Sequence, residues 1–262
     1  MDLNLAGRHA LVCGASEGIG RAAAHELALL GADVTVLARR AEVLTEVAAA
    51  LPRVADGQRH DSIATDVSDA ETLQDKVGRL VAERPVHILI NNTGGPPGGR
   101  AIDAGASDYL AAFQRHLLAN QALSQLTVPG MRSAGWGRIV NVVSTSVKEP
   151  IANLGVSNTI RGAVASWAKT LSKELGADGI TVNNLLPGYT RTQRLEQILR
   201  DRVQATGKDE SAISAAMLAS VPAGRFAEAH EIAAAIAFLA SPAAGYITGV
   251  SLAVDGGRMQ SI

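Results

Sequence analysis

Short apolar runs alternate with longer stretches of helical periodicity along almost the whole chain. The short runs are nearly continuous in apolar character, which is typical of strands that helices cover on both faces. These runs predict seven strands, at 9–15, 33–39, 62–67, 87–92, 138–144, 180–186 and 250–255. The intervening patterns predict helices at about 18–30, 41–50, 69–83, 106–130, 157–176 and 228–240. Strands that alternate with helices in this way indicate an α/β fold with a doubly wound, seven-stranded parallel sheet.

The chain has no internal repeat, low-complexity tract or linker that would divide it. A length of 262 residues is ordinary for one α/β domain, so a single domain is expected over 1–262. The segment 190–221 differs from the rest because it is charged and irregular, and it lies between a strand and the last helix. We expect this segment to form a helical flap over a substrate.

Composition excludes several classes of protein. The formal net charge of −1 offers no basic surface for nucleic acid. The apolar runs are too short to span a membrane, and the start of the chain does not read as a signal peptide, so a cytoplasmic protein is expected. The single cysteine, Cys13, cannot form an internal disulfide or build a zinc site alone, and no metal is expected.

A glycine-rich turn follows the first predicted strand. In "CGASEGIG", Gly14, Gly18 and Gly20 fall in the turn and the first helical residues, and Ser16, Glu17 and Ile19 fill the places between them. Glycine lets the backbone approach a pyrophosphate, and the N-terminus of a helix attracts its charge. A tight strand-to-helix turn without a ligand is the alternative interpretation.

Four further stretches resemble the short-chain dehydrogenase/reductase family in order and position, as the glycine spacing does. They are "DVSD" (66–69), "NNTGG" (91–95), "PGYTRT" (187–192) and "YITGVSLAVDGG" (246–257). The resemblance covers essentially the whole chain. It implies a single-domain Rossmann fold and an oxidoreductase that uses a nicotinamide cofactor.

The resemblance also implies roles for individual residues of the cofactor site. Asp66 would bind the adenine amino group beside the Val67 backbone, and Asn92 and Gly94 would line the cleft. The nicotinamide end would be held by Pro187, Gly188, Thr190 and Thr192. A helix-capping role for Asp66 and a simple strand-end turn at 91–92 stay open as alternatives.

The end of the second predicted strand bears on the choice of cofactor. An NAD site places a carboxylate there, whereas an NADP site supplies arginine for the 2′-phosphate. The sequence "LARRAE" has Ala38 where the acid would stand, followed by Arg39 and Arg40, which favours NADP(H) over NAD(H). Glu17 would oppose a phosphate unless it points away, and the two arginines could instead be the solvated start of a helix.

The catalytic centre departs from the family's pattern of serine, tyrosine and lysine. Ser144 takes the place of the serine, but the tyrosine and lysine positions hold Ser157 and Arg161. An aliphatic hydroxyl is a far weaker acid than a phenol, whose unperturbed pKa is about 10, and arginine always stays charged. Binding of a cofactor should therefore survive this exchange better than proton transfer does.

Other residues could contribute to the chemistry. Lys148 and Tyr189 could enter the site, although a solvated loop lysine and a pocket wall are the alternatives. Ser157 could instead cap the helix that follows it. His116 stands where relatives often have a water-relay asparagine, or it could lie on a helix surface.

The segments "VKEPIANLGVSNTIRGAV" and "TGGPPGGR" (93–100) resemble a divergent branch of the family labelled 3-oxoacyl-[acyl-carrier-protein] reductase-like. Two hypotheses follow: an NADP(H)-dependent oxidoreductase that interconverts a carbonyl and a secondary alcohol, or a nucleotide-binding sensor or partner protein with little turnover. The resemblance also implies a homo-oligomer, expected to be a tetramer, paired through the helices near 106–130 and 157–176. The substrate would be a small carbonyl, alcohol or acyl-thioester compound.

Overall fold

One parallel sheet organises the computed structural model, which describes residues 1–261. Its seven strands lie in the order β3-β2-β1-β4-β5-β6-β7. They are β1 His9–Cys13, β2 Asp33–Ala38, β3 His60–Ala64, β4 Ile88–Asn91, β5 Gly137–Val142, β6 Ile180–Pro187 and β7 Ser251–Val254. The predicted doubly wound α/β fold with a seven-stranded sheet is confirmed.

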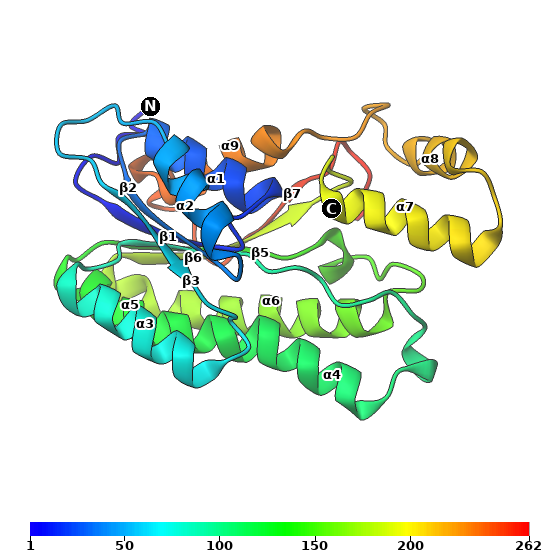
Figure 1. The fold of residues 1–262 in the computed structure, drawn as a ribbon, viewed down its shortest axis with the longest axis horizontal. Helices are drawn as coiled ribbons and strands as arrows, with labels where there is room; N and C mark the ends of the chain where they lie inside the picture. The colour runs from blue at the N-terminus through cyan, green and yellow to red at the C-terminus, as the bar shows by residue number, and fades with distance from the viewer. Residues whose placement is uncertain (262) are drawn as a thin grey trace.

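Helices cover both faces of the sheet (Figure 1). One face carries α1 Gly18–Leu29, α2 Ala41–Ala50 and α9 Ala229–Ala240, and the other carries α3 Ala70–Glu83, α5 Ala119–Ser133 and α6 Gly155–Leu175. Because side chains of a strand alternate between faces, Ala10 and Val12 of β1 pack under the first layer and Leu11 under the second. Both faces of the strand are thus buried, which explains its continuous apolar sequence.

The helix predicted over 106–130 is interrupted. The structure has α4 Ala106–Phe113, a π-helical segment Gln114–Leu118 and then α5, which runs through Pro129 to Ser133. Short π-helical segments occur frequently at functional sites. Here the segment carries His116, whose side chain is buried rather than on the helix surface.

The segment 190–221 folds mainly into two helices, α7 Gln193–Thr206 and α8 Glu210–Leu218, as the prediction of a helical flap requires. Gly207, with a φ of 65°, ends α7 and lets the chain turn back. Leu195, Leu199, Ile213, Met217 and Phe226 form a small separate apolar cluster. The flap therefore has its own packing at one end of the molecule (Figure 1).

A ladder of amide side chains crosses four strands inside the sheet. Asn91 donates to Asn141 at 2.8 Å, Asn141 donates to Asn184 at 3.1 Å, and Asn184 donates to Ser251 at 3.2 Å. These residues are direct neighbours in the strand register. The ladder gives each of the three buried amide nitrogens an acceptor and links β4 through β7, although the Asn91 Oδ1 has no partner within the described residues.

No helix within residues 1–261 is long and apolar enough to cross a membrane. The described part of the chain also contains no cluster of three or more His, Cys, Asp or Glu side chains that could hold a metal ion.

Candidate active site

A cleft of about 620 Å³ opens at the carboxyl ends of the central strands. It lies where the strand order reverses between β1 and β4, the place at which doubly wound sheets bind their ligands. We call the part lined by 14–19, 37–40 and 65–67 the cofactor half. The substrate half is lined by Thr93, Gly94, Gly95, Ser144, Leu154, Ser157, Arg161, Tyr189, Arg194, Leu195 and Ile198.

The glycine turn in the cofactor half is built by close backbone contacts. Gly14 has a φ of +60°, and a Cβ on it would lie 2.5 Å from the Asn92 carbonyl oxygen. A Cβ on Gly20 would lie 2.3 Å from the Gly14 carbonyl oxygen. Gly20 does not line the cleft itself but lets the helix pack against the turn. Only glycine fits these two positions without a shift of the backbone.

The N-terminus of α1 faces the cleft at Gly18 and Ile19. Its N-cap residue, Glu17, has an extended backbone and makes no side-chain hydrogen bond to the helix. The first N–H groups of α1 therefore lack a side-chain cap, and the helix dipole adds a partial positive charge there. Together with the glycine turn, this helix end has the arrangement that binds a pyrophosphate.

The charges around the glycine turn are paired. The Glu17 carboxylate lies 2.5 Å from Nη2 of Arg40, which also donates to Ser16 at 3.3 Å. The Gln193 amide, oriented to satisfy its nitrogen, donates to the same carboxylate at 3.1 Å. Arg39 is exposed at the rim of the cleft and makes no ion pair within the described residues. Arg39 is thus the arginine better placed to receive an added phosphate.

Asp66 does not cap the helix that follows it, so the alternative of a capping role is wrong. Its Oδ1 accepts from the Ser68 backbone N–H at 2.9 Å. The cap of α3 is Asp69, which accepts from the Thr72 backbone N–H at 3.1 Å. Asp66 and Val67 line the cleft beyond the end of β3.

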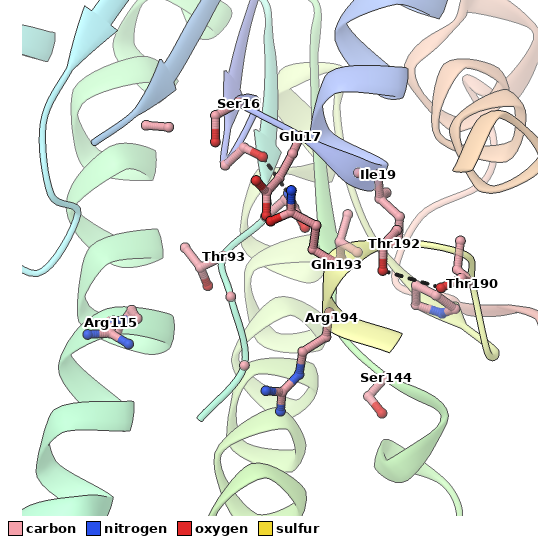
Figure 2. Close-up of a pocket in the computed structure, with 18 of the residues that line it drawn as sticks. Ser16, Glu17, Ile19, Thr93, Arg115, Ser144, Thr190, Thr192, Gln193 and Arg194 are labelled. Atoms are coloured by element: carbon pink, nitrogen blue, oxygen red, sulfur yellow. Dashed lines mark hydrogen bonds between the residues drawn. The ribbon is translucent and has the colours of Figure 1, made fainter. Parts of the chain in front are cut away.

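Residues at and after the ends of β4 and β6 also line the cleft. Asn92 donates to the Cys13 and Gly14 carbonyl oxygens at 3.3 and 3.2 Å, so it ties two strand ends together. Thr192 donates to the Thr190 carbonyl oxygen at 3.2 Å, a contact drawn in Figure 2. The remaining predicted residues of these loops, Gly94, Pro187 and Gly188, also line the cleft.

Three of the four candidate catalytic residues meet in the substrate half. Ser144, Ser157 and Arg161 all line it, the first after β5 and the other two one turn apart on α6. The Ser144 hydroxyl oxygen accepts from the Ser146 backbone N–H at 3.1 Å. Ser157 is not the N-cap of α6, which is Leu154, because the helix begins at Gly155. The capping alternative for Ser157 is therefore wrong.

The guanidinium of Arg161 is buried beneath this site. Its Nη1 donates to the Val142 carbonyl oxygen at 2.7 Å, whereas its Nε has no hydrogen-bond partner within the described chain. Burial and the nearby charge of Arg194 lower the pKa of Arg161 to about 10. The side chain therefore stays cationic at neutral pH.

Lys148 and Tyr189 differ in their placement. Lys148 follows the short helical turn Thr145–Val147, is exposed and does not line the cleft. Because Lys148 is not among the residues that line the cleft, the structure does not bring its amine into the site. Tyr189 lines the cleft and packs edge-on against Phe226, with the Arg258 guanidinium over its ring. This environment is typical of a pocket wall.

Two polar residues that line the cleft, Arg194 and Thr93, were not predicted. Arg194 reaches from the first turn of α7 into the cleft (Figure 2) and donates to the Pro96 carbonyl oxygen at 2.9 Å. Thr93 lines the cleft, and its hydroxyl lies 2.6 Å from Nδ1 of the buried His116. The only available signal for Arg194 was its position within the charged flap, directly after "YTRTQ".

A family model described as enoyl-(acyl carrier protein) reductase matches residues 14–258. This match covers nearly the whole chain, including the glycine turn and the flap. The chain belongs to the short-chain dehydrogenase/reductase family. The prediction of an enzyme of this family is confirmed.

Relatives within the family extend over almost the full chain. The 3-oxoacyl-[acyl-carrier-protein] reductase FabG of Haemophilus influenzae is 34% identical over 254 residues, 96% of this chain and 98% of that protein. The crystal structure of YwfH, an NADPH-dependent reductase involved in bacilysin biosynthesis, is 30% identical with a TM-score of 0.92, over 97% of this chain and 99% of that one. L-Sorbose reductase of Gluconobacter frateurii, solved with NADPH and L-sorbose, is 29% identical with a TM-score of 0.92 over 100% of both chains.

Proposed function

We propose that this short-chain dehydrogenase/reductase is an NADP(H)-dependent oxidoreductase that interconverts a carbonyl and a secondary alcohol. The proposal rests on one observation: the glycine turn lines the same cleft as Ser144, Ser157 and Arg161. Relatives named as NADPH-dependent reductases or solved with NADP support the choice of cofactor.

The residues present fit a phosphorylated dinucleotide. A Cβ on Gly94 would meet no atom within 4 Å, so the absence of a side chain there leaves room in the cleft. Ala38 removes the carboxylate that an NAD site would place at the end of β2, and Arg39 stands beside it. The α1 N-terminus would hold the pyrophosphate, Asp66 the adenine, and the loop with Thr190 and Thr192 the nicotinamide end.

When bound, NADPH would supply the hydride that reduces the carbonyl carbon. Ser144 would hold the carbonyl oxygen, because its own oxygen already accepts from the Ser146 N–H and its hydroxyl proton remains for donation. Arg161 would stabilise the negative charge that develops on that oxygen, and burial strengthens this electrostatic contribution.

Ser157 would pass a proton to the new alkoxide oxygen and recover one from solvent. An aliphatic hydroxyl is a poor acid in water, so this relay depends on the neighbouring cation one helical turn away on α6. We expect turnover to be slower than in relatives that use a phenol.

NADPH oxidation tests the proposal. Stopped-flow and steady-state fluorescence would follow NADPH with a panel of ketones, ketoses and β-ketoacyl thioesters, and we expect oxidation by at least one compound. The similarity to 3-oxoacyl-[acyl-carrier-protein] reductases is the reason for including the thioesters. NADPH binding without oxidation by any member of the panel would instead support the nucleotide-binding alternative.

We also propose that the chain assembles into a homo-oligomer, expected to be a tetramer, through the helices over 106–130 and 157–176. Leu110 of α4 and Leu118, the last residue of the π-helical segment, are 68% and 43% exposed. Covering these side chains would remove apolar surface from water. A light-scattering mass of one chain at micromolar concentration would contradict the assembly.

A further inference from the structure

Two guanidinium groups meet over one glycine in the substrate half. Nη2 of Arg194 lies 3.5 Å and Nη2 of Arg161 lies 3.7 Å from the place that a Cβ on Gly95 would occupy. Both nitrogens are therefore within 3.7 Å of one point above this backbone. A side chain at residue 95 would fill the space that the two cations share.

No carboxylate compensates these charges. Among the residues that line the whole cleft, the only acidic ones are Glu17 and Asp66, and both belong to the cofactor half. Glu17 already pairs with Arg40. The nearby His116 is buried, and burial with the charges of Arg161 and Arg115 lowers its pKa to about 3, so it is neutral and leaves the two arginines as the charges at this point. Two like charges this close raise the free energy of the site unless an anion joins them.

The Arg161 guanidinium also has hydrogen-bond donors without a partner. Only Nη1 makes a hydrogen bond, to the Val142 carbonyl oxygen, and Nε has no partner within residues 1–261 although Arg161 is only 8% exposed. A buried donor without a partner is costly, and native proteins usually satisfy it with another group or a ligand. The unused donors are on the same guanidinium that faces Gly95.

Arg194 lies on α7, whereas Arg161 lies on α6, and a hydrogen bond fixes its position in the cleft. Its Nη2 donates to the Pro96 carbonyl oxygen, so the flap and the 93–100 segment position it together. Figure 2 shows it between the Thr93 segment and Ser144. The preceding residue, Gln193, is directed to Glu17 in the cofactor half. The flap thus contributes polar side chains to both halves, Gln193 to the cofactor half and Arg194 to the substrate half.

The walls beside the two arginines are apolar. Leu154, Leu195 and Ile198 line the same half of the cleft, so the space suits a compact molecule with one charged end. Ser144 and Ser157, which would hold the reacting oxygen, lie in this half as well.

We propose that the substrate is an oxo acid, whose carboxylate is bound jointly by Nη2 of Arg161 and Nη2 of Arg194 while its ketone or aldehyde oxygen faces Ser144 and a remaining donor of Arg161. This inference rests on the proposed function for the carbonyl chemistry, but the carboxylate site itself depends only on the two arginines. Planar guanidinium groups bind carboxylates through paired, charge-assisted hydrogen bonds, which explains why arginine stands at both positions.

Calorimetry on the full chain saturated with NADP⁺ tests this site without turnover. The probes are pyruvate, 3-oxobutanoate and 4-oxopentanoate, each compared with its own methyl ester. We expect at least one acid to bind about 10- to 100-fold more tightly than its ester, because the ester cannot make the charge-assisted contacts. Inorganic phosphate is titrated in parallel, and tighter binding of phosphate than of every acid would show that the site takes a phosphate instead.

The variant Arg194→Gln should abolish the preference for the acid and leave NADP⁺ affinity unchanged. Arg200→Gln is the matched control, because Arg200 is exposed on the same helix and does not line the cleft. The inference would be overturned if acid and ester bound equally well, or if no acid bound with a dissociation constant in the millimolar range or below. It would also be overturned if Arg194→Gln kept the preference for the acid. Failure of the proposed function would look different: the acid would bind preferentially, yet no panel compound would oxidise NADPH.

Discussion

Charge is balanced in the cofactor half of the cleft and unbalanced in the substrate half. In the first, Glu17 pairs with Arg40 and Asp66 adds a second carboxylate, while Arg39 and the backbone N–H groups of α1 provide positive potential. In the second, Arg161 and Arg194 face the same glycine with no acidic residue among the lining side chains. The two unpaired arginines of the substrate half indicate that its ligand carries a negative charge. The cofactor half, in which positive and negative side chains are both present, gives no such indication.

The two halves of the cleft also differ in whether backbone or side chains determine their shape. The cofactor half depends on glycines whose added Cβ atoms would collide with backbone, so its shape is set by the turn itself. The substrate half depends on long side chains contributed by α6 and the flap. Substitutions in the two halves should therefore separate binding of the cofactor from the chemistry.

The largest effect is expected at Arg161. Arg161→Ala should lower kcat/KM by about 100-fold or more, because it removes a buried cation that acts on the developing oxyanion.

Ser157→Ala should lower kcat by about 10-fold or more with unchanged NADPH affinity, since a proton relay acts only in the transition state. Steady-state kinetics and NADPH titration measure both. Lys173→Ala, an exposed charge on the same helix, is the control, and full activity in both test variants would assign the chemistry to other residues.

At Arg39 the expected effect is smaller and confined to one cofactor. Arg39→Ala should weaken NADPH binding by about 1–3 kcal/mol through loss of a charge-assisted phosphate contact, and should leave NADH binding almost unchanged. Fluorescence titration with both nucleotides gives the comparison. Arg53→Ala is the control, because it removes the same charge from another exposed position. Equal losses for NADPH and NADH would remove Arg39 from the phosphate site.

Acid pH should weaken the fold through two buried histidines. Burial lowers the pKa of His116 to about 3 and that of His9 to about 4, both below the unfolded value of 6.5. Protonation therefore favours the unfolded chain, so stability is fully present above pH 6.5 and falls as the pH drops towards these folded values. The expected slope is about 1.4 kcal/mol per pH unit for each histidine.

Urea unfolding between pH 7 and pH 5 measures this slope, and His116→Asn should reduce it. The exposed His25 provides the control variant His25→Asn, which should keep the full slope. A free energy of unfolding that is constant over this interval would contradict the burial of neutral histidines as the cause.

Glu17 should give the smallest effect and the opposite sign. Glu17→Gln removes the partner of Arg40 and frees a second guanidinium near Arg39, so NADPH should bind a few-fold more tightly. Exposed ion pairs contribute little by themselves, which limits the change in stability. The titration is repeated with Glu46→Gln, an exposed acid on α2. Weaker NADPH binding in Glu17→Gln would mean that the carboxylate positions Arg40 for the phosphate.

The sequence was informative where backbone geometry determines the residue type. Gly14 and Gly20 are required by close contacts, so the turn could be located from their spacing. The sheet was also predictable, because strands buried on both faces are continuously apolar. The π-helical segment at 114–118 was not, since the backbone stays helical at both of its ends and no capping residue or turn marks it in the sequence.

Side chains that meet only through tertiary structure could not be paired from the sequence. Arg161 and Arg194 are far apart along the chain, and only the flap's packing brings the second to Gly95. His116 was placed at a helix position without any signal that its partner is Thr93. Lys148 is near Ser144 in sequence, but it is exposed and only Ser144 lines the cleft.

The amide ladder across β4 to β7 has a consequence for how the chain folds. Its three hydrogen bonds join residues 50, 43 and 67 positions apart, so each requires a long loop to close first. A slip of one residue between two of these strands would bury unpaired amides and turn apolar side chains to the wrong face. Misregistered sheets are thereby penalised late in assembly, and the chain should fold slowly but into one strand register.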